Sequence, residues 1–347
     1  WKYLSKIGDN KKYYISINLY QFSRVGFQDV EPLAPLMADS NSLPHDRGHL
    51  LWTADEGPSR MLLSSMDRWI NTILADDGIE MPFMGGNSDA SATIIARGSG
   101  IIVGTTMVDH LIQIWAPSVQ ISWFAKDGKK VSSGDEIAEL KGDKETLLTI
   151  ERSILNILGQ LSGIATEAKK WTALAKGQIA CTRKTIWGLL DKWAVHMGGG
   201  LSHRLNKNDA MMIKENDLAS MFNDLEDNSA RIAKFLQEIE ITTCGAFLEI
   251  EVREQKEALT AAAIWKEKEI EDKPKLVIML DNFGPEKSKD TAAQMVDMGL
   301  RDWVILEASG GIVFNTLKDW YECGLDVLST SSLNRGVTPL DISMIFG

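Results

Sequence analysis

The sequence predicts an α/β protein in two parts, an N-terminal α/β open sandwich followed by an α/β barrel of about six or seven strands. From residue 177 onward, short apolar runs alternate with helical stretches, an order that requires a parallel sheet. Charged residues stand directly after several of these runs, where a barrel places its functional side chains. No GxGxxG pattern follows the first run, and its absence argues against the alternative of an open doubly wound sheet.

The barrel strands and helices follow from the spacing of apolar residues. The expected strands are 178–181, 210–213, 246–250, 276–280, 303–306 and 325–328. The expected helices are 188–196, 218–238, 254–268, 288–298 and 316–323.

The N-terminal part reads as an antiparallel sheet with helices on one face. Apolar residues at helical spacing predict a helix at 61–74. The pattern at 92–102 predicts two paired strands with a turn at Gly98–Gly100. Other expected elements are strands at 13–20, 119–123 and 135–140, a loop at 31–44, and a long helix at 145–176 with an internal break at 162–165. The predicted domains are an extension of unknown role (1–64), the sandwich with its connecting helix (65–176), the barrel (177–335), and a tail expected to return to the N-terminal domain (336–347).

Composition excludes several classes of function. A net charge of -11 argues against nucleic acid as the main partner, because binding a phosphate backbone needs a broad basic face. No apolar run approaches the length of a membrane helix, and three widely spaced cysteines read as buried thiols of a cytoplasmic protein. His45 and His49 stand four residues apart, but Pro44 and Gly48 favour a loop over a helical metal-binding pair.

Cations gather between residues 179 and 218 in spite of the acidic background. Three short clusters, Thr182-Arg183-Lys184, His203-Arg204 and Lys214, follow or lie between the first two expected barrel strands. A compact group of cations in an acidic chain predicts a pocket for a small anion.

At these residues the sequence resembles the quinolinate phosphoribosyltransferase family. The resemblance rests on ordered elements from about residue 95 to the C-terminus: ERSILNILGQLSGIAT, TRKT, GGG-x-x-HR, IKEN, EIEV, LDNFGPE and EASGGI. It implies a TIM-like barrel and a decarboxylating transferase that joins quinolinate to phosphoribosyl pyrophosphate. It also implies a homodimer or larger homo-oligomer, in which Arg152 of the ERSILN helix reaches a neighbouring chain's site.

The resemblance assigns roles to individual residues. It places Arg152, Arg183, Lys184, His203, Arg204 and Lys214 at quinolinate, and Thr182, Lys184, Glu251, Asp281, Ser309, Gly310, Gly311 and Ser331 at phosphoribosyl pyrophosphate. Lys184, Glu251 and Asp281 are the expected catalytic residues. Glu251 and Asp281 close apolar runs and are the expected Mg²⁺ ligands, because this ion takes carboxylate oxygens. Glu249 shares the periodicity of Glu251, and the second glutamate of the E-x-E pair is chosen by resemblance.

Several positions depart from the family pattern: Ser202 before His-Arg, Asp217 in the IKEN segment, Ser331 in place of a glycine, and Arg335 where histidine is frequent. They leave two alternatives open. One is a relative with another anionic substrate, such as a molybdenum-transport-associated homologue or a nicotinate-specific enzyme. The other is a non-catalytic barrel, which the presence of both Glu251 and Asp281 disfavours.

Overall fold

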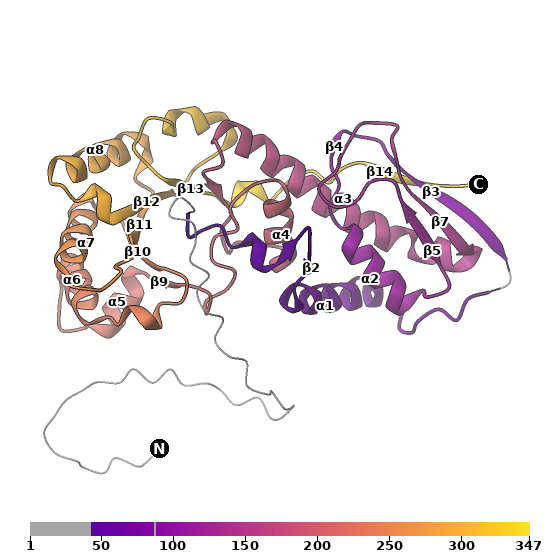
Figure 1. The fold of residues 1–347 in the computed structure, drawn as a ribbon, viewed down its shortest axis with the longest axis horizontal. Helices are drawn as coiled ribbons and strands as arrows, with labels where there is room; N and C mark the ends of the chain where they lie inside the picture. Colours follow the sequence, from indigo (N-terminus) through magenta and orange to yellow (C-terminus); the bar gives the residue numbers. More distant parts are fainter. Residues whose placement is uncertain (1–42, 87) are drawn as a thin grey trace, which may run out of the picture. The chain divides into compact units, whose positions relative to one another are not determined.

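The structure is a computed structural model that describes residues 43–86 and 88–347 (Figure 1). The strand expected at 13–20 lies outside these ranges, as does all but the end of the loop expected at 31–44. Among the described residues, no helix has the combined length and hydrophobicity of a membrane span. The three cysteines are free and buried.

A six-stranded parallel sheet forms the C-terminal part, which confirms the predicted barrel class. Its order is β8 (Ile179–Ala180), β13 (Val327–Ser329), β12 (Val304–Ser309), β11 (Leu276–Asp281), β10 (Leu248–Val252) and β9 (Met211–Ile213). Each strand lies within or overlaps one of the six expected apolar runs. The runs are short because a barrel strand needs only a few residues to pair on both sides.

The two faces of this sheet differ because successive side chains of a strand point to opposite sides. Leu248, Ile250 and Val252 of β10 pack toward the helices, in one buried cluster with Trp265. The alternate residues point inward, where Phe247 packs with Ala210, Val277 and Ile305. Further along β10, Glu249 continues this inward row and has no exposed surface. The inner face therefore changes from apolar to charged toward the carboxyl ends of the strands.

Helices follow the strands, with two corrections to the prediction. They are α4 (Leu189–Met197), α5 (Glu215–Met221), α6 (Asn228–Glu238), α7 (Gln255–Glu267) and α8 (Gly284–Asp297). The single helix expected at 218–238 is divided, because Asp227 caps a new helix at Ser229 and Arg231 bonds the carbonyls of Phe222 and Leu225 in the break. The helix expected at 316–323 is a 3₁₀ segment, η4 (Phe314–Trp320).

The N-terminal domain has a four-stranded antiparallel sheet in the order β14 (Ile342–Phe346), β3 (Asp89–Ala96), β7 (Glu136–Asp143) and β5 (Gln120–Trp123). The helices α1 (Arg60–Asp76) and α2 (Thr105–Trp115) accompany it, with two short ribbons, β1 (Trp52–Thr53) with β2 (Gly57–Pro58) and β4 (Gly100–Ile101) with β6 (Lys130–Val131).

The hairpin expected at 92–102 is wrong. β3 pairs with β7 and β14, whereas β4 pairs with β6. The backbone N–H groups of Arg97 and Gly98 both donate to the carbonyl of Asp341, so the chain at Gly98 meets the C-terminal segment instead of folding back on β3. A distant strand therefore takes the place of the expected local partner.

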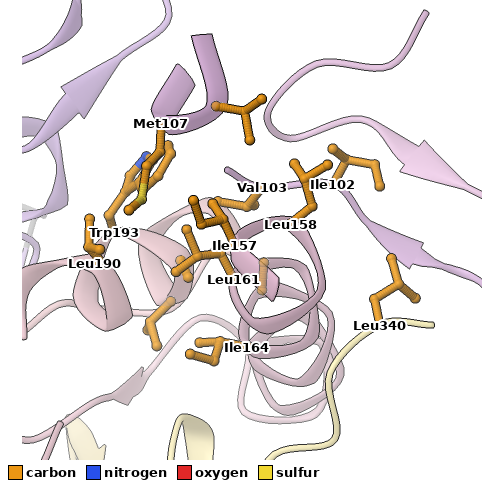
Figure 2. Packing of buried hydrophobic residues seen from close by; sticks show 14 of the residues in the cluster. Ile102, Val103, Met107, Ile157, Leu158, Leu161, Ile164, Leu190, Trp193 and Leu340 are labelled. Atoms are coloured by element: carbon orange, nitrogen blue, oxygen red, sulfur yellow. The ribbon is translucent and has the colours of Figure 1, made fainter. Parts of the chain in front are cut away.

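The connecting helix α3 (Lys144–Leu174) is continuous, so the break expected at 162–165 is also wrong. Its apolar face packs against Ile102, Val103, Met107, Leu190, Trp193 and Leu340, as Figure 2 shows for Ile157, Leu158, Leu161 and Ile164. Gly159 and Gly163 lie where the chain at Pro339 and Leu340 crosses the helix. These glycines permit a close helix-to-backbone contact and do not interrupt the helix.

Gly163→Ala is expected to destabilise the protein, although alanine is normally preferred to glycine in a helix by about 1 kcal/mol. A Cβ at this position would lie 2.5 Å from the carbonyl oxygen of Thr338 and 2.9 Å from Cα of Pro339. Because both are backbone atoms, the clash should lower the free energy of unfolding by about 1–3 kcal/mol. Urea denaturation measures it, with Gly159→Ala, whose nearest contact is 3.1 Å, as the milder control. A more stable Gly163→Ala protein would show that the crossing segment moves aside freely.

Candidate active site

The carboxyl ends of the six strands meet at one edge of the parallel sheet. The register sets Asp281 opposite Ser309, Ser309 opposite Ser329, and Leu328 and Ser329 opposite Ile179 and Ala180 of β8. On the other side, Ile213 pairs with Ile250, so the next residues, Lys214 and Glu251, lie level. Residues that end or follow these strands are therefore brought to one edge.

Most of the predicted site residues lie at this edge. They are Thr182, Arg183 and Lys184 after β8, Lys214 after β9, Glu251 in β10, Asp281 at the end of β11, Ser309, Gly310 and Gly311 at and after the end of β12, and Ser331 after β13. His203 and Arg204 are buried and lie between Leu201, which bridges Ala180 of β8, and the start of β9. Arg152 is different, because it is exposed on α3 and its neighbour Ser153 bonds Asp77 beside α1. It belongs to the N-terminal domain.

A pocket of about 290 Å³ opens beside Arg183. Besides Arg183 it is lined by two further cations, Lys192 and Lys207, and by the side chain of Asn206. Lys192 is buried on α4, and its Nζ donates to the carbonyl of Ser202 at 2.6 Å. Neither lysine was predicted, because Lys192 lies within a helical pattern and Lys207 within a loop. The pocket nevertheless has the cationic lining that the TRKT cluster suggested.

Each of the two expected metal ligands lies against a cation. Nζ of Lys214 contacts Glu251, which is mostly buried, and Nε of Arg253 lies 3.8 Å from Asp281. Arg253 also donates to Glu215 at 2.7 Å. Arg253 was missed in the sequence, where its position directly after the LEIEV strand was the available signal. An anion that binds Lys214 must compete with the carboxylate of Glu251.

The loop after β12 can be built only with glycine at residue 310. Gly310 has φ +98°, and a Cβ there would lie 2.2 Å from Oδ1 of Asn282. Asn282 in turn donates its N–H to the carbonyl of Ser309 at 2.8 Å. Because η4 is a 3₁₀ segment, the helix expected at 316–323 does not present an α-helical N-terminus to this loop.

A second group of ionisable side chains is sealed inside the barrel, below the edge. His203 Nε2 lies 3.3 Å from Oε1 of Glu307 and 3.6 Å from Oε2 of Glu249, and both glutamates have no exposed surface. His45 joins them from the N-terminal segment, with Nε2 at 2.8 Å from Oε2 of Glu307. Because Glu249 is enclosed here, Glu251 is the glutamate of the E-x-E pair that reaches the edge.

Burial governs the protonation of this group. Burial and the neighbouring Glu307 both raise the pKa of Glu249, so this side chain is the protonated carboxyl of the pair. Burial alone would also raise the pKa of Glu307, but His203 and His45 outweigh it and lower that pKa. Burial would lower the pKa of His203, whereas Glu307 and Glu249 raise it to about 10.

The geometry opposes that protonation of His203. Its Nδ1 accepts a hydrogen bond from the peptide N–H of Arg204 at 2.7 Å, so a second ring proton would face this N–H directly. We therefore assign the neutral ring with its proton on Nε2. In this arrangement both ring nitrogens of His203 are turned to protein groups.

Comparison with known proteins places these features in a family. Residues 164–345 match the C-terminal domain model of quinolinate phosphoribosyl transferase, and residues 79–162 match its N-terminal domain model. The sheet edge, the connecting helix and the N-terminal sheet all lie within these matches, whereas His45 precedes them.

Similar proteins carry related names. The chain is 32% identical over 260 residues to the probable nicotinate-nucleotide pyrophosphorylase (carboxylating) of Methanothermobacter thermautotrophicus, covering 73% of this chain and 87% of that protein. It is 34% identical over 272 residues to the chloroplastic nicotinate-nucleotide pyrophosphorylase (carboxylating) of Oryza sativa, covering 74% and 69%. The nicotinate-nucleotide pyrophosphorylase structure from Francisella tularensis superposes with a TM-score of 0.65 at 28% identity, covering 82% of this chain and 96% of that chain. The chain belongs to the quinolinate phosphoribosyltransferase family.

Proposed function

We propose that this protein converts quinolinate and phosphoribosyl pyrophosphate to nicotinate mononucleotide, pyrophosphate and CO₂, a step of NAD biosynthesis. The observation that carries the proposal is the single edge at which cations and carboxylates from neighbouring parallel strands meet. The names of the similar proteins support the same reaction.

Quinolinate has two adjacent carboxylates, so its site needs several cations in a partly dry pocket. Arg183 and Arg204 are suited to it because a guanidinium donates two parallel hydrogen bonds to a carboxylate. Arg204 is buried and fixed, since Nη1 donates to the carbonyl of Ala210 at 3.1 Å. Lys184 and Lys214 are exposed at the same edge and add positive charge. His203 lies directly beside Arg204.

Phosphoribosyl pyrophosphate would occupy the neighbouring strand ends. The backbone of Ser309, Gly310 and Gly311 can approach a phosphate closely, because glycine presents N–H groups without a side chain. Glu251 and Asp281 offer carboxylate oxygens at the ends of adjacent strands, which fits the one or two protein ligands that Mg²⁺ usually takes beside phosphates and water. Bound there, Mg²⁺ would supply neutralising charge to the pyrophosphate.

The reaction forms two bonds and breaks two. The pyridine nitrogen of quinolinate bonds to C1 of the ribose as the C1–O bond to pyrophosphate breaks. The carboxylate beside that nitrogen then leaves as CO₂, its electron pair stays on the ring carbon, and a proton takes its place. The positively charged ring nitrogen stabilises that electron pair, so the chain's residues need to orient the substrates and stabilise charge.

The assay combines the purified protein with quinolinate, phosphoribosyl pyrophosphate and Mg²⁺, and follows nicotinate mononucleotide and CO₂. Product should depend on both substrates. Nicotinate in place of quinolinate tests the nicotinate-specific alternative, and molybdate binding tests the molybdenum-associated one. Absence of product with either pyridine would contradict the proposal and favour a non-catalytic barrel.

Asp281→Asn is expected to lower activity strongly while leaving quinolinate binding intact. The substitution keeps the size of the side chain but removes the charge that would help to hold Mg²⁺-pyrophosphate. Activity and calorimetric binding of quinolinate without phosphoribosyl pyrophosphate are the two measurements. Asp302→Asn is the matched control, because Asp302 is exposed before the amino end of β12, at the opposite edge of the sheet. Equal loss of activity and quinolinate binding in Asp281→Asn would indicate a role in the fold instead.

The proposal includes a cytoplasmic homodimer, or a larger homo-oligomer, with shared sites. It is supported by the position of Arg152, which is exposed on α3 and belongs to the N-terminal domain. A neighbouring chain's Arg152 would then reach the edge that carries Arg183 and Lys184. Two such chains related by a two-fold axis complete two sites at once.

A further inference from the structure

The segment at 43–51 joins the two ends of the parallel sheet. The sheet order ends at β8 and β9, and Leu201 forms a parallel bridge beside β8. The carbonyl of His45 accepts the N–H of His203 at 2.9 Å, next to that bridge. Arg47 donates to Asp209 at 2.7 Å, just before β9. The segment thus contacts both sides of the seam between the first and last strands, and it precedes the residues that match the family's domain models.

His45 enters the barrel from this segment. It has no exposed surface, and its ring stands edge-on to His203 with centroids 4.9 Å apart. Its Nε2 lies 2.8 Å from Oε2 of Glu307. Phe247 packs on both histidines, with its ring centroid 5.0 Å from that of His45 and 5.8 Å from that of His203. The side chain is therefore enclosed with a carboxylate and excluded from water.

Glu307 depends on histidine for partners. Among the described residues, neither of its carboxylate oxygens has a partner in hydrogen-bond geometry, and the two ring nitrogens of His45 have none either. The ring nitrogens within reach are Nε2 of His45 and Nε2 of His203, at 2.8 and 3.3 Å from separate oxygens. A buried carboxylate left without donors is costly, so loss of either histidine partner should move or protonate Glu307.

His203 connects this carboxylate to the substrate edge. Its Nδ1 accepts the peptide N–H of Arg204, which leaves the ring proton on Nε2, facing Glu307. The backbone of His203 is left-handed, with φ +54°, a conformation that needs support from its surroundings. His45, His203 and Glu307 have ligand atoms within 4.8 Å of one another, but a protonated Nε2 offers no lone pair to a metal ion. The arrangement fits a chain of close polar contacts, from His45 through Glu307 to His203, that ends in the hydrogen bond from Arg204.

We propose that His45 is a positioning residue that holds Glu307 against His203, and through it fixes the ring tautomer of His203 and the backbone of Arg204 at the quinolinate site. This inference rests on the proposed function for its kinetic consequence. Its structural consequence, the Nε2–H tautomer of His203, does not depend on any activity.

Three variants separate this role from general packing. His45→Leu removes the donor, whereas His45→Gln keeps an N–H that can reach Glu307. His49→Leu is the matched control, because His49 is exposed on the same segment. The chain has five histidines in all, so ¹⁵N-histidine labelling with long-range ¹H–¹⁵N correlation can assign the tautomer of His203.

In the parent protein and in His49→Leu, His203 should show the Nε2–H tautomer. His45→Leu should shift His203 to a mixture of forms and raise KM for quinolinate about tenfold, the effect of losing about 1.4 kcal/mol from one hydrogen bond to a charged group. KM for phosphoribosyl pyrophosphate should change by less than about twofold, because His45→Leu removes no contact to that substrate. His45→Gln should resemble the parent in both measurements.

Two results overturn the inference: an unchanged His203 tautomer and quinolinate KM in folded His45→Leu, or a parent protein in which His203 is not the Nε2–H form. If His45→Leu does not fold, the test rests on His45→Gln. A folded His45→Gln protein in which His203 has lost the Nε2–H tautomer would contradict the role of the N–H at residue 45. A parent that does not use quinolinate contradicts the proposed function alone, because the tautomer is still measured.

Discussion

Arg183→Ala should weaken quinolinate binding by ten- to hundredfold without unfolding the protein. Arg183 is exposed at the edge of the sheet and lines the cationic pocket, so its loss removes a charge-assisted contact of about 1.5–3 kcal/mol. Because the Arg183 side chain is exposed, the free energy of unfolding should change by less than about 0.5 kcal/mol. Calorimetry with quinolinate and urea denaturation measure the two effects.

Arg68→Ala is the matched control, since Arg68 is an exposed arginine of α1 whose guanidinium donates to Ser64 on the same helix. Arg204→Ala provides a contrast, because this buried guanidinium also donates to the carbonyl of Ala210 beside β9. It should lose stability as well as affinity. Parent-like quinolinate affinity in Arg183→Ala would remove this residue from the carboxylate site.

Mixing two inactive variants, Arg152→Ala and Lys184→Ala, should restore activity. A mixed dimer pairs the Lys184 of one chain with the Arg152 of the other and so contains one intact site. Random exchange between equal amounts would give mixed dimers in half of the molecules, and about one quarter of parental sites would be intact. The prediction follows from the exposed position of Arg152 on α3, beside the contact of Ser153 with Asp77.

Chain exchange in that experiment is followed by native mass spectrometry of differently tagged chains. Each variant mixed with itself is the control and should stay inactive. Activity that does not return when exchange is complete would mean that Arg152 acts within its own chain or outside the site.

The sequence alone determined the elements that depend on local periodicity. The apolar runs around β8 to β13 are bounded by loops, and each contains or overlaps a strand because buried parallel strands are short and continuously apolar. The residues after those runs then had to lie at one edge, because the strands of a parallel sheet all end on the same side. The pattern of runs was therefore sufficient to place Lys214, Glu251 and Asp281 together.

Only the tertiary structure decided which distant segments meet. Gly98 was expected in a local hairpin and Gly163 at a helix break, but the C-terminal segment pairs with β3 and crosses α3 at these points. The periodicity of apolar residues carries no information about such distant partners. A glycine in the sequence also does not show whether it permits a turn or a close backbone contact.

The same limit applied to the interior of the barrel. His45 lies in a loop that has no periodic pattern. Glu249 and Glu251 have the same place in the alternation of β10, so the sequence could not show that Glu249 is buried against His203 while Glu251 contacts Lys214. Burial and the protonation that follows from it depend on four regions of the chain, around His45, His203, Glu249 and Glu307, enclosing the same space. That closure is a property of the folded chain, because a charge is desolvated only when its neighbours have excluded water.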